Sequence, residues 1–494
     1  MYEFEIVKQL RSGLCARLLA QAHGLEFEDA CTEESMLQTL VSKLHSTKSH
    51  YDAWQVLQVT TGQLPSYKQV QELQILSCVA LDSDELSRYV FENMVIARGL
   101  IGLAPVTKVV SDKNVVLFES SHLISLNSGI QQVSRIIAKS FALNSSFVLL
   151  SVSPDGSGFT DMTEEEKDHL LQENFSSPDE DLIPNTSPST NVLLSNCRVL
   201  IPEVTKNIEL ASRLRALGAF SDNEIFYVGY DLIPILAPEY VAPREIESFA
   251  HYALATTESS GIICISDQTE KEFSGYLNAR KTVTEYKGTL VTLPLPVVQP
   301  QVGNVDCEQE GFSKLVKGSY ILCVGTIEPR KNQRKVVAAF NEFWAKGGKN
   351  QIVFVGRIAS QNENHFQAGI QQDLGERVFH FTDLPQDSLG WLYKNSLATI
   401  QVSDYEGYGL PVVESIAHGK PVIVNPFGVQ FELAQGNGGL AVLDNSVTEL
   451  ANAIERISRD IDLLSNLEDE AKKANFPTID DYANGIVRVL NKEG

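Results

Sequence analysis

The sequence predicts an α/β chain in which a helical block precedes two doubly wound domains. The chain has 494 residues, and at roughly 100–200 residues per domain this length allows about three domains. Short β-rich runs alternate with helical patterns over residues 109–300 and again over 310–477, the order typical of parallel sheets built from βα units. Residues 1–108 instead show apolar side chains at helical spacing.

Composition and charge exclude several classes of protein. The formal net charge is −23, which argues against nonspecific binding to nucleic acid and against more than peripheral contact with a membrane. The seven cysteines form no CxxC pair, so zinc ribbons, iron–sulfur clusters and a disulfide framework lose support. No apolar run approaches the roughly 20 residues of a membrane helix, and the first residues lack a secretion signal layout. We therefore expect a cytoplasmic protein, at most peripheral to the inner face of the membrane.

The helical block, residues 1–108, has apolar repeats such as SMLQTLVSKLHS and ELSRYVFENMVIARGLIGL. Pro105 and the following TKVVSDKN predict the exit from this block. Its role stays open between a scaffold or self-association module and a docking domain for an acceptor or a protein partner.

The first βα domain, residues 109–300, begins with the strand-like NVVLFE and the helical GIQQVSRIIAKSFAL. Further strand-like runs are SFVLLSVS, CRVLIPE, EIFYVGYDLIP, GIICIS and GTLVTLPLP. Residues 156–191 interrupt this rhythm, with nine acidic residues against one lysine between positions 161 and 181. This composition favours a surface loop.

The second βα domain, residues 310–477, repeats the rhythm more clearly and follows a linker, VVQPQVGNVDCEQEG. Its strand-like runs are YILCVG, QIVFVG, RVFHF, LATIQVS, PVIVN and GLAVL. A last helix is expected in residues 478–494. Because open α/β sheets bind ligands beyond the carboxyl ends of their strands, two such domains in tandem predict a cleft between them.

One candidate site follows the strand LATIQVS. Pro411 suits the first turn of a helix and Gly419 the position just after its end, so the pattern predicts a helix over residues 410–418. Gly407 and Gly409 let the backbone before it approach a ligand closely, and the start of a helix binds phosphate. The alternative is an ordinary surface loop before a helix whose first turns carry a glutamate that favours the helix dipole.

A second candidate site follows the strand YILCVG, in the run VGTIEPRKN. Gly325 permits a tight turn, and Arg330 with Lys331 supplies two adjacent cations. A diphosphate needs such neutralising charges, for which Arg offers a planar fork and Lys a point charge. A solvated Arg-Lys pair without a ligand is the equally open alternative.

Together the two runs resemble the retaining glycosyltransferases of the GT-B fold, specifically glycosyltransferase family four. The spacing of Glu406 and Glu414 matches that family's E-x7-E pattern, within EGYGLPVVESIAHGKPVIV. GTIEPRKN is similar to a version common in bacterial mannosyltransferases of the family. The resemblance implies a GT-B fold with an extra N-terminal helical domain, and transfer of a sugar from a nucleotide-diphosphate donor.

The resemblance also implies roles for single residues. Glu414 would accept hydrogen bonds from the ribose, and Glu406 would hold the donor sugar and favour its cationic ring. Arg330, Lys331 and the helix start would stabilise the leaving diphosphate, without a metal or other cofactor, and the leaving phosphate would take the acceptor's proton. The further donor-binding positions are Gly325, Thr326, Gly407, Tyr408, Gly409 and Leu410.

On the acceptor side the match is looser. Gly129, in NSGIQQV, resembles the family's glycine loop, and Tyr230-Asp231 in YDLIP resembles its HDLIP element. Tyr230 stands where many members have His, and it could donate a hydrogen bond to the sugar but not shuttle a proton. Thr326 stands where many members have a phosphate-binding Arg, which leaves Arg330 and Lys331 to hold the diphosphate. His122 follows a strand, and a structural role is more plausible for it than one in the cleft.

The identity of the substrates stays open. GTIEPRKN favours GDP-mannose, with UDP-glucose and UDP-N-acetylglucosamine as alternatives. The acceptor is expected to be a growing polysaccharide, a lipid-linked sugar or a protein glycan. The alternatives to a transferase are a nucleotide-sugar epimerase or a phosphorylase of the same fold and, from another class, a noncatalytic partner subunit that stabilises an active homologue.

Overall fold

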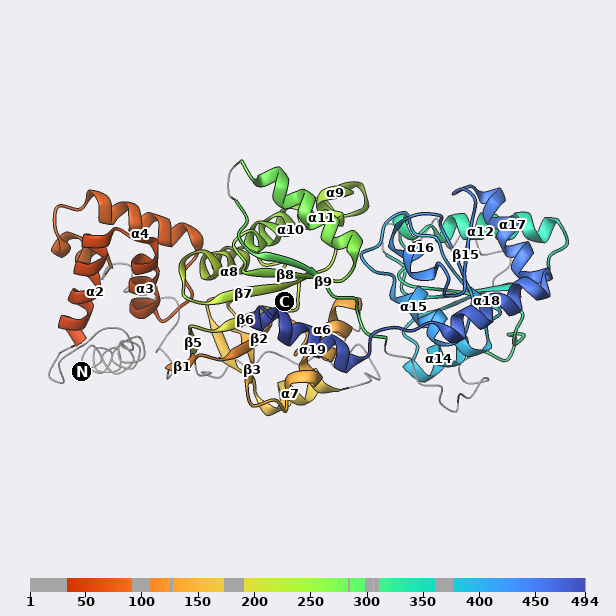
Figure 1. Cartoon of the computed structure of the whole chain (residues 1–494), viewed down its shortest axis with the longest axis horizontal. Helices are drawn as coiled ribbons and strands as arrows, with labels where there is room; N and C mark the ends of the chain where they lie inside the picture. The colour runs from red at the N-terminus through yellow and green to blue at the C-terminus, as the bar shows by residue number, and fades with distance from the viewer. Residues whose placement is uncertain are drawn as a thin grey trace.

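The computed structural model describes residues 33–90, 107–124, 128–172, 191–282, 285–297, 305, 311–359 and 376–493. Along its longest axis lie, in chain order, a group of helices, a nine-stranded sheet and a six-stranded sheet (Figure 1). The sheets carry helices on their faces, as the sequence predicts. The first 32 residues and residues 91–106 of the predicted helical block lie outside the described part.

The described helical block contains α2 (Glu33–Thr47), α3 (His50–Thr61) and α4 (Tyr67–Val79). Ser49 and Ser66 cap α3 and α4, because each hydroxyl accepts a hydrogen bond from a backbone N–H of the first turn. The block packs against α8 (Ile208–Phe220) of the next domain: the rings of His50 and Phe220 stack 4.9 Å apart. Its apolar core is continuous with that of the nine-stranded sheet, so this part is a structural extension of the first βα domain.

The nine-stranded sheet has the order β1-β5-β4-β3-β2-β6-β7-β8-β9. The strands are β1 (Thr107–Ser111), β2 (Asn114–Phe118), β3 (Phe147–Val152), β4 (Phe159–Asp161), β5 (Asn191–Ser195), β6 (Arg198–Ile201), β7 (Glu224–Gly229), β8 (Gly261–Cys264) and β9 (Thr289–Thr292). All pairs are parallel except β3 with β4 and β4 with β5.

Two sequence-based expectations differ from the structure in this domain. The edge strand β1, which pairs in parallel with β5, begins at Thr107 and so takes up the last two residues of the predicted helical block. The predicted surface loop of residues 156–191 contains the antiparallel strand β4 and the helix α7 (Glu164–Leu171); residues 173–190 lie outside the described part. Both errors concern short elements, which give little periodic signal.

Helices cover both faces of the first sheet. In β2, Val115 and Leu117 point to the core shared with α8 and α10 (Pro243–Thr256), whereas Val116 and Phe118 point to the core shared with α6 (Gly129–Phe141). This alternation follows from the two-residue period of a strand. The short helix α9 (Ile233–Leu236) and the helix α11 (Asp267–Arg280) complete the domain.

The second sheet is entirely parallel, with the order β12-β11-β10-β13-β14-β15. All six predicted runs form strands: β10 (Tyr320–Val324), β11 (Gln351–Val355), β12 (Val378–Phe381), β13 (Ala398–Gln401), β14 (Val422–Val424) and β15 (Gly439–Ala441). In chain order this is 3-2-1-4-5-6, the doubly wound order of dinucleotide-binding sheets. The helices are α12 (Gln333–Ala345), α14 (Gln386–Asn395), α15 (Leu410–Ala417), α16 (Gly428–Ala434), α17 (Val447–Arg459) and α18 (Ile461–Lys473).

The chain crosses between the two βα domains twice. After α18 it returns to the first domain, where α19 (Ile479–Asn491) lies beside α6 (Figure 1). The two crossing segments are joined by a 3.3 Å hydrogen bond from the N–H of Val297 to the carbonyl of Pro477. The predicted C-terminal helix therefore belongs to the core of the first domain, not to the second.

Candidate active site

The site begins at the centre of the second sheet, where the strand order reverses. β10 and β13 are neighbours there, with Ile321 opposite Ala398. The loop after β10 carries residues 325–332 and the loop after β13 carries residues 402–409, so the two motifs predicted from the sequence meet at this edge. The backbone N–H of Asp404 donates to the carbonyl of Arg330 at 2.7 Å. This switch point is where open α/β sheets bind their ligands.

Glu406 is the centre of a charged group at this edge. Its carboxylate lies 3.0 Å from Nη1 of Arg330 and 3.5 Å from Nζ of Lys331, and it accepts a 2.9 Å hydrogen bond from the Ser403 hydroxyl. Arg330 also pairs with Glu328 at 2.7 Å. Each of the Glu406, Arg330 and Lys331 side chains is less than one fifth exposed, so the group is partly shielded but open to solvent.

The charges of this group reinforce one another. Burial alone would favour the protonated carboxyl of Glu406, but Lys331 and Arg330 outweigh it and hold its pKa below the usual range. Burial would lower the pKa of Arg330, and Glu406 and Glu328 instead raise it. Both pKa shifts favour the ion pair, so Glu406 is ionised beside a charged Arg330 at neutral pH.

Glycines shape the backbone around these charges. Gly325 has φ 129°, and a Cβ there would lie 2.8 Å from Nζ of Lys331. Gly409 occupies the N-cap of α15 and has φ 106°. This left-handed backbone conformation immediately before the helix is strained for every residue except glycine. The helix itself confirms the prediction for residues 410–418 to within one residue. Gly419 follows it with φ 68°.

Glu414 lies inside α15 and is held by a residue that sequence reasoning missed. The hydroxyl of Tyr393, on α14, donates a 2.7 Å hydrogen bond to Oε2 of Glu414. Burial raises the pKa of Glu414, opposed by this hydrogen bond and by the charge of Lys331. Lys331 thus acts electrostatically on both glutamates of the E-x7-E pattern. Nothing in the sequence around Tyr393 marks this contact.

A second missed residue, Asn332, joins the two loops. It has φ 59°, a left-handed conformation that Asn tolerates better than most residues. Its side-chain amide donates to Oδ1 of Asp404 at 2.7 Å and to the carbonyl of Val402 at 2.9 Å. The predicted phosphate-side residue Thr326 contributes its carbonyl, which accepts a 2.9 Å bond from Gln333.

Asp231 and Gly129, of the first βα domain, lie against the loop and helix start of the second domain that carry Gly407 and Leu410. A Cβ on Gly407 would lie 3.1 Å from the Asp231 carboxylate, and a Cβ on Gly129 would lie 3.4 Å from Leu410. Burial raises the pKa of Asp231 to about 6, and the charge of Arg330 opposes that rise. The Asp231 carboxyl of the first domain therefore interacts electrostatically with Arg330 of the second domain.

Tyr230 does not have the role that the sequence suggested. Its hydroxyl donates a 2.7 Å hydrogen bond to the carbonyl of Pro202 inside the protein, and the residue is only 7% exposed. It packs in one apolar cluster with Tyr408, in the loop before α15, and with Tyr482 of α19. Tyr230 therefore supports the domain contact and does not present its hydroxyl to a sugar in this structure.

The strand-order reversal of the first sheet, between β2 and β6, carries another pair of carboxyls. Glu203 accepts hydrogen bonds of 2.7–2.8 Å from the backbone N–H groups of residues 119–121. Burial raises the pKa of the neighbouring Glu119 to about 7. His122 is 2% exposed, and burial lowers its pKa to about 4. His122 is thus a buried structural residue, as the sequence favoured.

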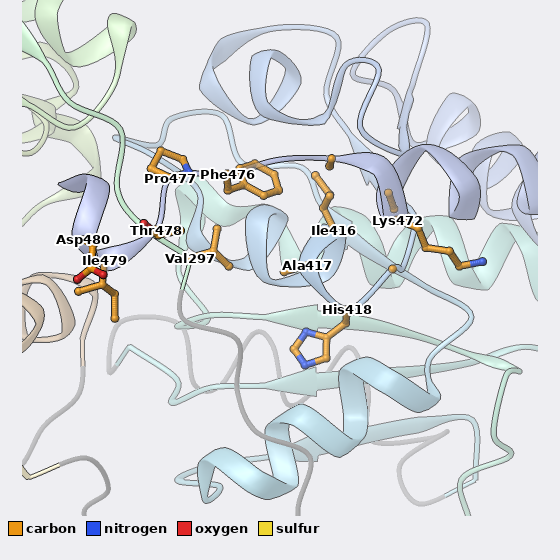
Figure 2. Close-up of a pocket in the computed structure, with 13 residues that line it drawn as sticks. Val297, Ile416, Ala417, His418, Lys472, Phe476, Pro477, Thr478, Ile479 and Asp480 are labelled. Atoms are coloured by element: carbon orange, nitrogen blue, oxygen red, sulfur yellow. The ribbon is translucent and has the colours of Figure 1, made fainter. Parts of the chain in front are cut away.

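A cavity of about 770 Å³ lies at the opposite end of α15 from Gly409. Figure 2 shows its lining by Ile416 and His418 from the end of the helix and by Val297, Phe476 and Pro477 from the two crossing segments. The His418 ring stacks on Tyr393, with centroids 5.1 Å apart. This cavity is separate from the charged group around Glu406.

Among the residues that the structure describes, no group of three or more His, Cys, Asp or Glu side chains is arranged to hold a metal ion. No helix within the same ranges is long and apolar enough to cross a bilayer.

Comparison with known proteins matches the second βα domain to one family. Residues 308–474 match the family described as "Glycosyl transferases group 1". The serotype-specific mannosyltransferase WbdA of Escherichia coli is 26% identical over 253 residues, which are 48% of this chain and 29% of WbdA. The O-antigen chain mannosyltransferase RfbU of Salmonella typhimurium is 22% identical over 292 residues, 56% of this chain and 81% of RfbU. The chain thus spans less than a third of WbdA.

Solved structures are similar over most of the chain. Anabaena Alr3699/HepE, in complex with UDP and glucose, has a TM-score of 0.53 and 16% identity, over 77% of this chain and 99% of that one. The α,α-trehalose 6-phosphate synthase of Burkholderia multivorans has a TM-score of 0.53 and 12% identity, over 78% and 99%. At such identities the likeness shows the fold. The chain therefore has the GT-B fold, and its residues 308–474 are a glycosyltransferase group 1 domain.

Proposed function

We propose that the chain is a retaining glycosyltransferase that moves mannose from a nucleotide-diphosphate donor to a hydroxyl of a growing glycan. The observation that carries this proposal is the group of Glu406, Arg330 and Lys331 at the strand-order reversal of a glycosyltransferase group 1 domain. That edge of the sheet also holds the start of α15, which offers backbone N–H groups to an anion.

The leaving group is the diphosphate in this scheme. Negative charge develops on it as the bond to the sugar breaks, and fixed donors aimed at that charge lower the barrier. Arg330, Lys331 and the first N–H groups of α15 are such donors. They leave no requirement for a metal ion in the proposed step. The departing phosphate oxygen takes the acceptor's proton, so the reaction needs no separate protein base.

The two glutamates have different tasks in the proposal. Glu406 is ionised at neutral pH because its two cations lower its pKa, and its carboxylate binds the sugar hydroxyls and favours the cationic ring. Glu414 receives the Tyr393 hydroxyl on Oε2. We assign its other oxygen, Oε1, to a ribose hydroxyl of the donor.

The relatives support mannose as the sugar. WbdA and RfbU are both named mannosyltransferases, and a further relative of Escherichia coli is named O-antigen chain mannosyltransferase B, at 25% identity. These names also support a polysaccharide or lipid-linked glycan as the acceptor. The solved structure with UDP and glucose makes UDP-glucose the main competing donor.

The test is a transfer assay with purified protein. GDP-mannose, UDP-glucose and UDP-N-acetylglucosamine are each incubated with mannose-containing glycan acceptors, and nucleoside diphosphate release and product mass are measured. We expect GDP to be released only when acceptor is present, and the product to be heavier than the acceptor by one hexose. By NMR, the new glycosidic bond should have the same anomeric configuration as the donor. Glu406→Gln should abolish this product.

Three outcomes would contradict the proposal. Inversion of the anomeric centre would exclude the retaining mechanism. Conversion of the nucleotide sugar without any acceptor would indicate an epimerase. Absence of any reaction from the pure chain, with activity restored by a copurifying homologue, would indicate a noncatalytic partner subunit.

A further inference from the structure

The loop that carries Glu406 is held from the opposite domain by two hydroxyl groups. The carbonyl of Gly407 accepts a 2.7 Å hydrogen bond from the Ser266 hydroxyl and a 3.2 Å hydrogen bond from the Thr269 hydroxyl. Ser266 and Thr269 lie at the start of α11, in the first βα domain. They are 5% and 0% exposed, so water does not compete for these bonds.

The Gly407 carbonyl and the two hydroxyls form one hydrogen-bonded group. A carbonyl oxygen has two lone pairs and a hydroxyl has one proton to donate, so Gly407 can accept from both hydroxyls. The two hydroxyl oxygens also lie 3.0 Å apart, within hydrogen-bond distance of each other. Ser266 has a second task, because its oxygen also accepts the backbone N–H of Thr269 at 3.1 Å and caps α11. Since the trans peptide places its C=O and N–H on opposite sides, the N–H of Tyr408 points away from α11.

Further contacts from the first domain flank this point. The Tyr408 hydroxyl donates to the carbonyl of Leu295 at 3.0 Å, and the Tyr240 hydroxyl donates to Asp404 at 3.3 Å. Burial and the neighbouring Glu272 of α11 raise the pKa of Tyr405. The loop before α15 therefore takes its shape from both domains, although its residues belong to only one of them.

We propose that Ser266 and Thr269 are positioning residues for the donor site. They fix the peptide after Gly407 and, through it, the direction of the Glu406 carboxylate and of the first N–H groups of α15. Neither hydroxyl touches the donor in this proposal. Because they come from the acceptor-side domain, they make the arrangement of the donor loop depend on contact between the two domains. The catalytic part of this inference rests on the proposed transfer reaction.

The test uses Thr269→Val, Ser266→Ala and the double variant in the full chain. Thr269→Val keeps the shape and the backbone N–H that Ser266 caps, and removes the hydroxyl that lies 3.2 Å from the Gly407 carbonyl and 3.0 Å from the Ser266 hydroxyl. Because a buried carbonyl loses one of its hydrogen bonds, we expect kcat of sugar transfer to fall about tenfold in Thr269→Val and further in the double variant. The donor KM should change less than threefold, because Glu414 and Tyr393 are untouched.

A second readout does not depend on activity. Hydrogen–deuterium exchange of the free protein should show faster exchange in residues 403–409 of the double variant, with the rest of the second sheet unchanged. Ser66→Ala is the matched control, because Ser66 also caps a helix and is also 5% exposed but lies in the helical block. It should change neither kcat nor exchange in the loop.

The outcomes separate the two proposals. The positioning role would be overturned if the double variant had the same kcat, and the same hydrogen–deuterium exchange in residues 403–409, as Ser66→Ala. Loss of kcat accompanied by general unfolding of the first domain would also contradict it, since Thr269→Val is nearly isosteric. If the wild-type chain transfers no sugar with any donor, the proposed function fails, and the exchange result alone decides whether the two hydroxyls hold the loop.

Discussion

Glu406 stays ionised because two cations lie against a carboxylate that burial alone would protonate. Arg330 is shared between Glu406 and Glu328, whereas Lys331 has its charge directed at Glu406 and, at longer range, at Glu414. Removing either cation leaves negative charge poorly compensated and, in the proposed mechanism, removes a donor for the leaving diphosphate. Single residues at this site should therefore have large effects on turnover.

We expect Arg330→Ala and Lys331→Ala each to lower kcat by a hundred- to thousandfold. This is the usual effect of removing one fixed donor to developing charge, about 2.7–4 kcal/mol. Steady-state kinetics with saturating donor measures it. The matched controls are Arg459→Ala and Lys346→Ala, whose side chains pair with glutamates on the surface and should leave kcat unchanged. Near-normal turnover in both site variants would show that the phosphate assignment is wrong.

The hydrogen bond from Tyr393 to Glu414 should matter for donor binding. Tyr393→Phe removes the group that orients Oε2, and we expect the donor Kd to rise up to about tenfold, with little change in kcat. Calorimetric titration with the donor nucleotide measures it. Tyr227→Phe is a fitting control, because the Tyr227 hydroxyl is buried and has no hydrogen-bond partner among the described residues. A loss confined to kcat would contradict the ribose role of Glu414.

Glu119 should make stability depend on pH. Its pKa is about 7 in the folded chain against 4.5 for the free group, so between these values the folded state binds an extra proton and stability falls as pH rises. Glu119→Gln keeps an acceptor for the Thr205 hydroxyl but carries no charge. The variant should match wild type at pH 4.5 and exceed it by up to about 3 kcal/mol at pH 8, as measured by urea unfolding. If the variant and wild type were equally stable at pH 8 as well as at pH 4.5, burial of this charge would be contradicted.

Elements with strong periodicity were predictable from the sequence. The strands of the second sheet are continuous apolar runs because helices bury both faces of a parallel sheet, and all six were found. The short edge strand β1 and the three-residue β4 were missed, because each is too brief for a pattern. The helix α7 was missed because its acidic composition suggested a loop, although the capping box of Thr163 and Glu166 was legible as a helix start.

The site was predictable only where its residues are close in sequence. The E-x7-E pattern and the Arg-Lys pair each lie within one short run. Ser266 lies 141 positions from Gly407, and Tyr393 lies on a different helix from Glu414. Such contacts depend on how the domains and helices pack, which periodicity does not encode. For the same reason the inward direction of Tyr230 could not be foreseen.

The start of α15 should be sensitive to any side chain at Gly409. Its φ of 106° is unfavourable for L residues, and a Cβ would lie 3.2 Å from Gln430, so Gly409→Ala should cost about 1–3 kcal/mol of unfolding free energy and weaken nucleotide binding. Gly275→Ala is the control: Gly275 lies within α11 and a Cβ there meets nothing within 4 Å, so alanine should be neutral or stabilising. Urea unfolding of both variants gives the comparison. Equal stability of the two would contradict the left-handed start of α15.

Taken as a whole molecule, the chain is tied together by shared cores. Tyr408 and Val413 of the second domain pack in one apolar cluster with Leu295 and with Ile486 of α19. The helical block shares another cluster with the first sheet. Two crossing segments and these cores hold the strand-order reversal of the second sheet against the first domain, which is the arrangement that a transfer between a donor and an acceptor requires.

Nucleotide-sugar binding at the edge of the second sheet is tested most directly by a thermal-shift comparison of GDP, UDP and their sugar conjugates on wild type and Glu414→Ala. A ligand at a hundred times its Kd stabilises the folded state by about 2.7 kcal/mol. We expect one nucleotide family, GDP and GDP-mannose, to raise the Tm of wild type and to shift that of Glu414→Ala much less. No shift of either protein by any nucleotide, or equal shifts of both, would contradict a nucleotide-sugar site at the edge of the second sheet.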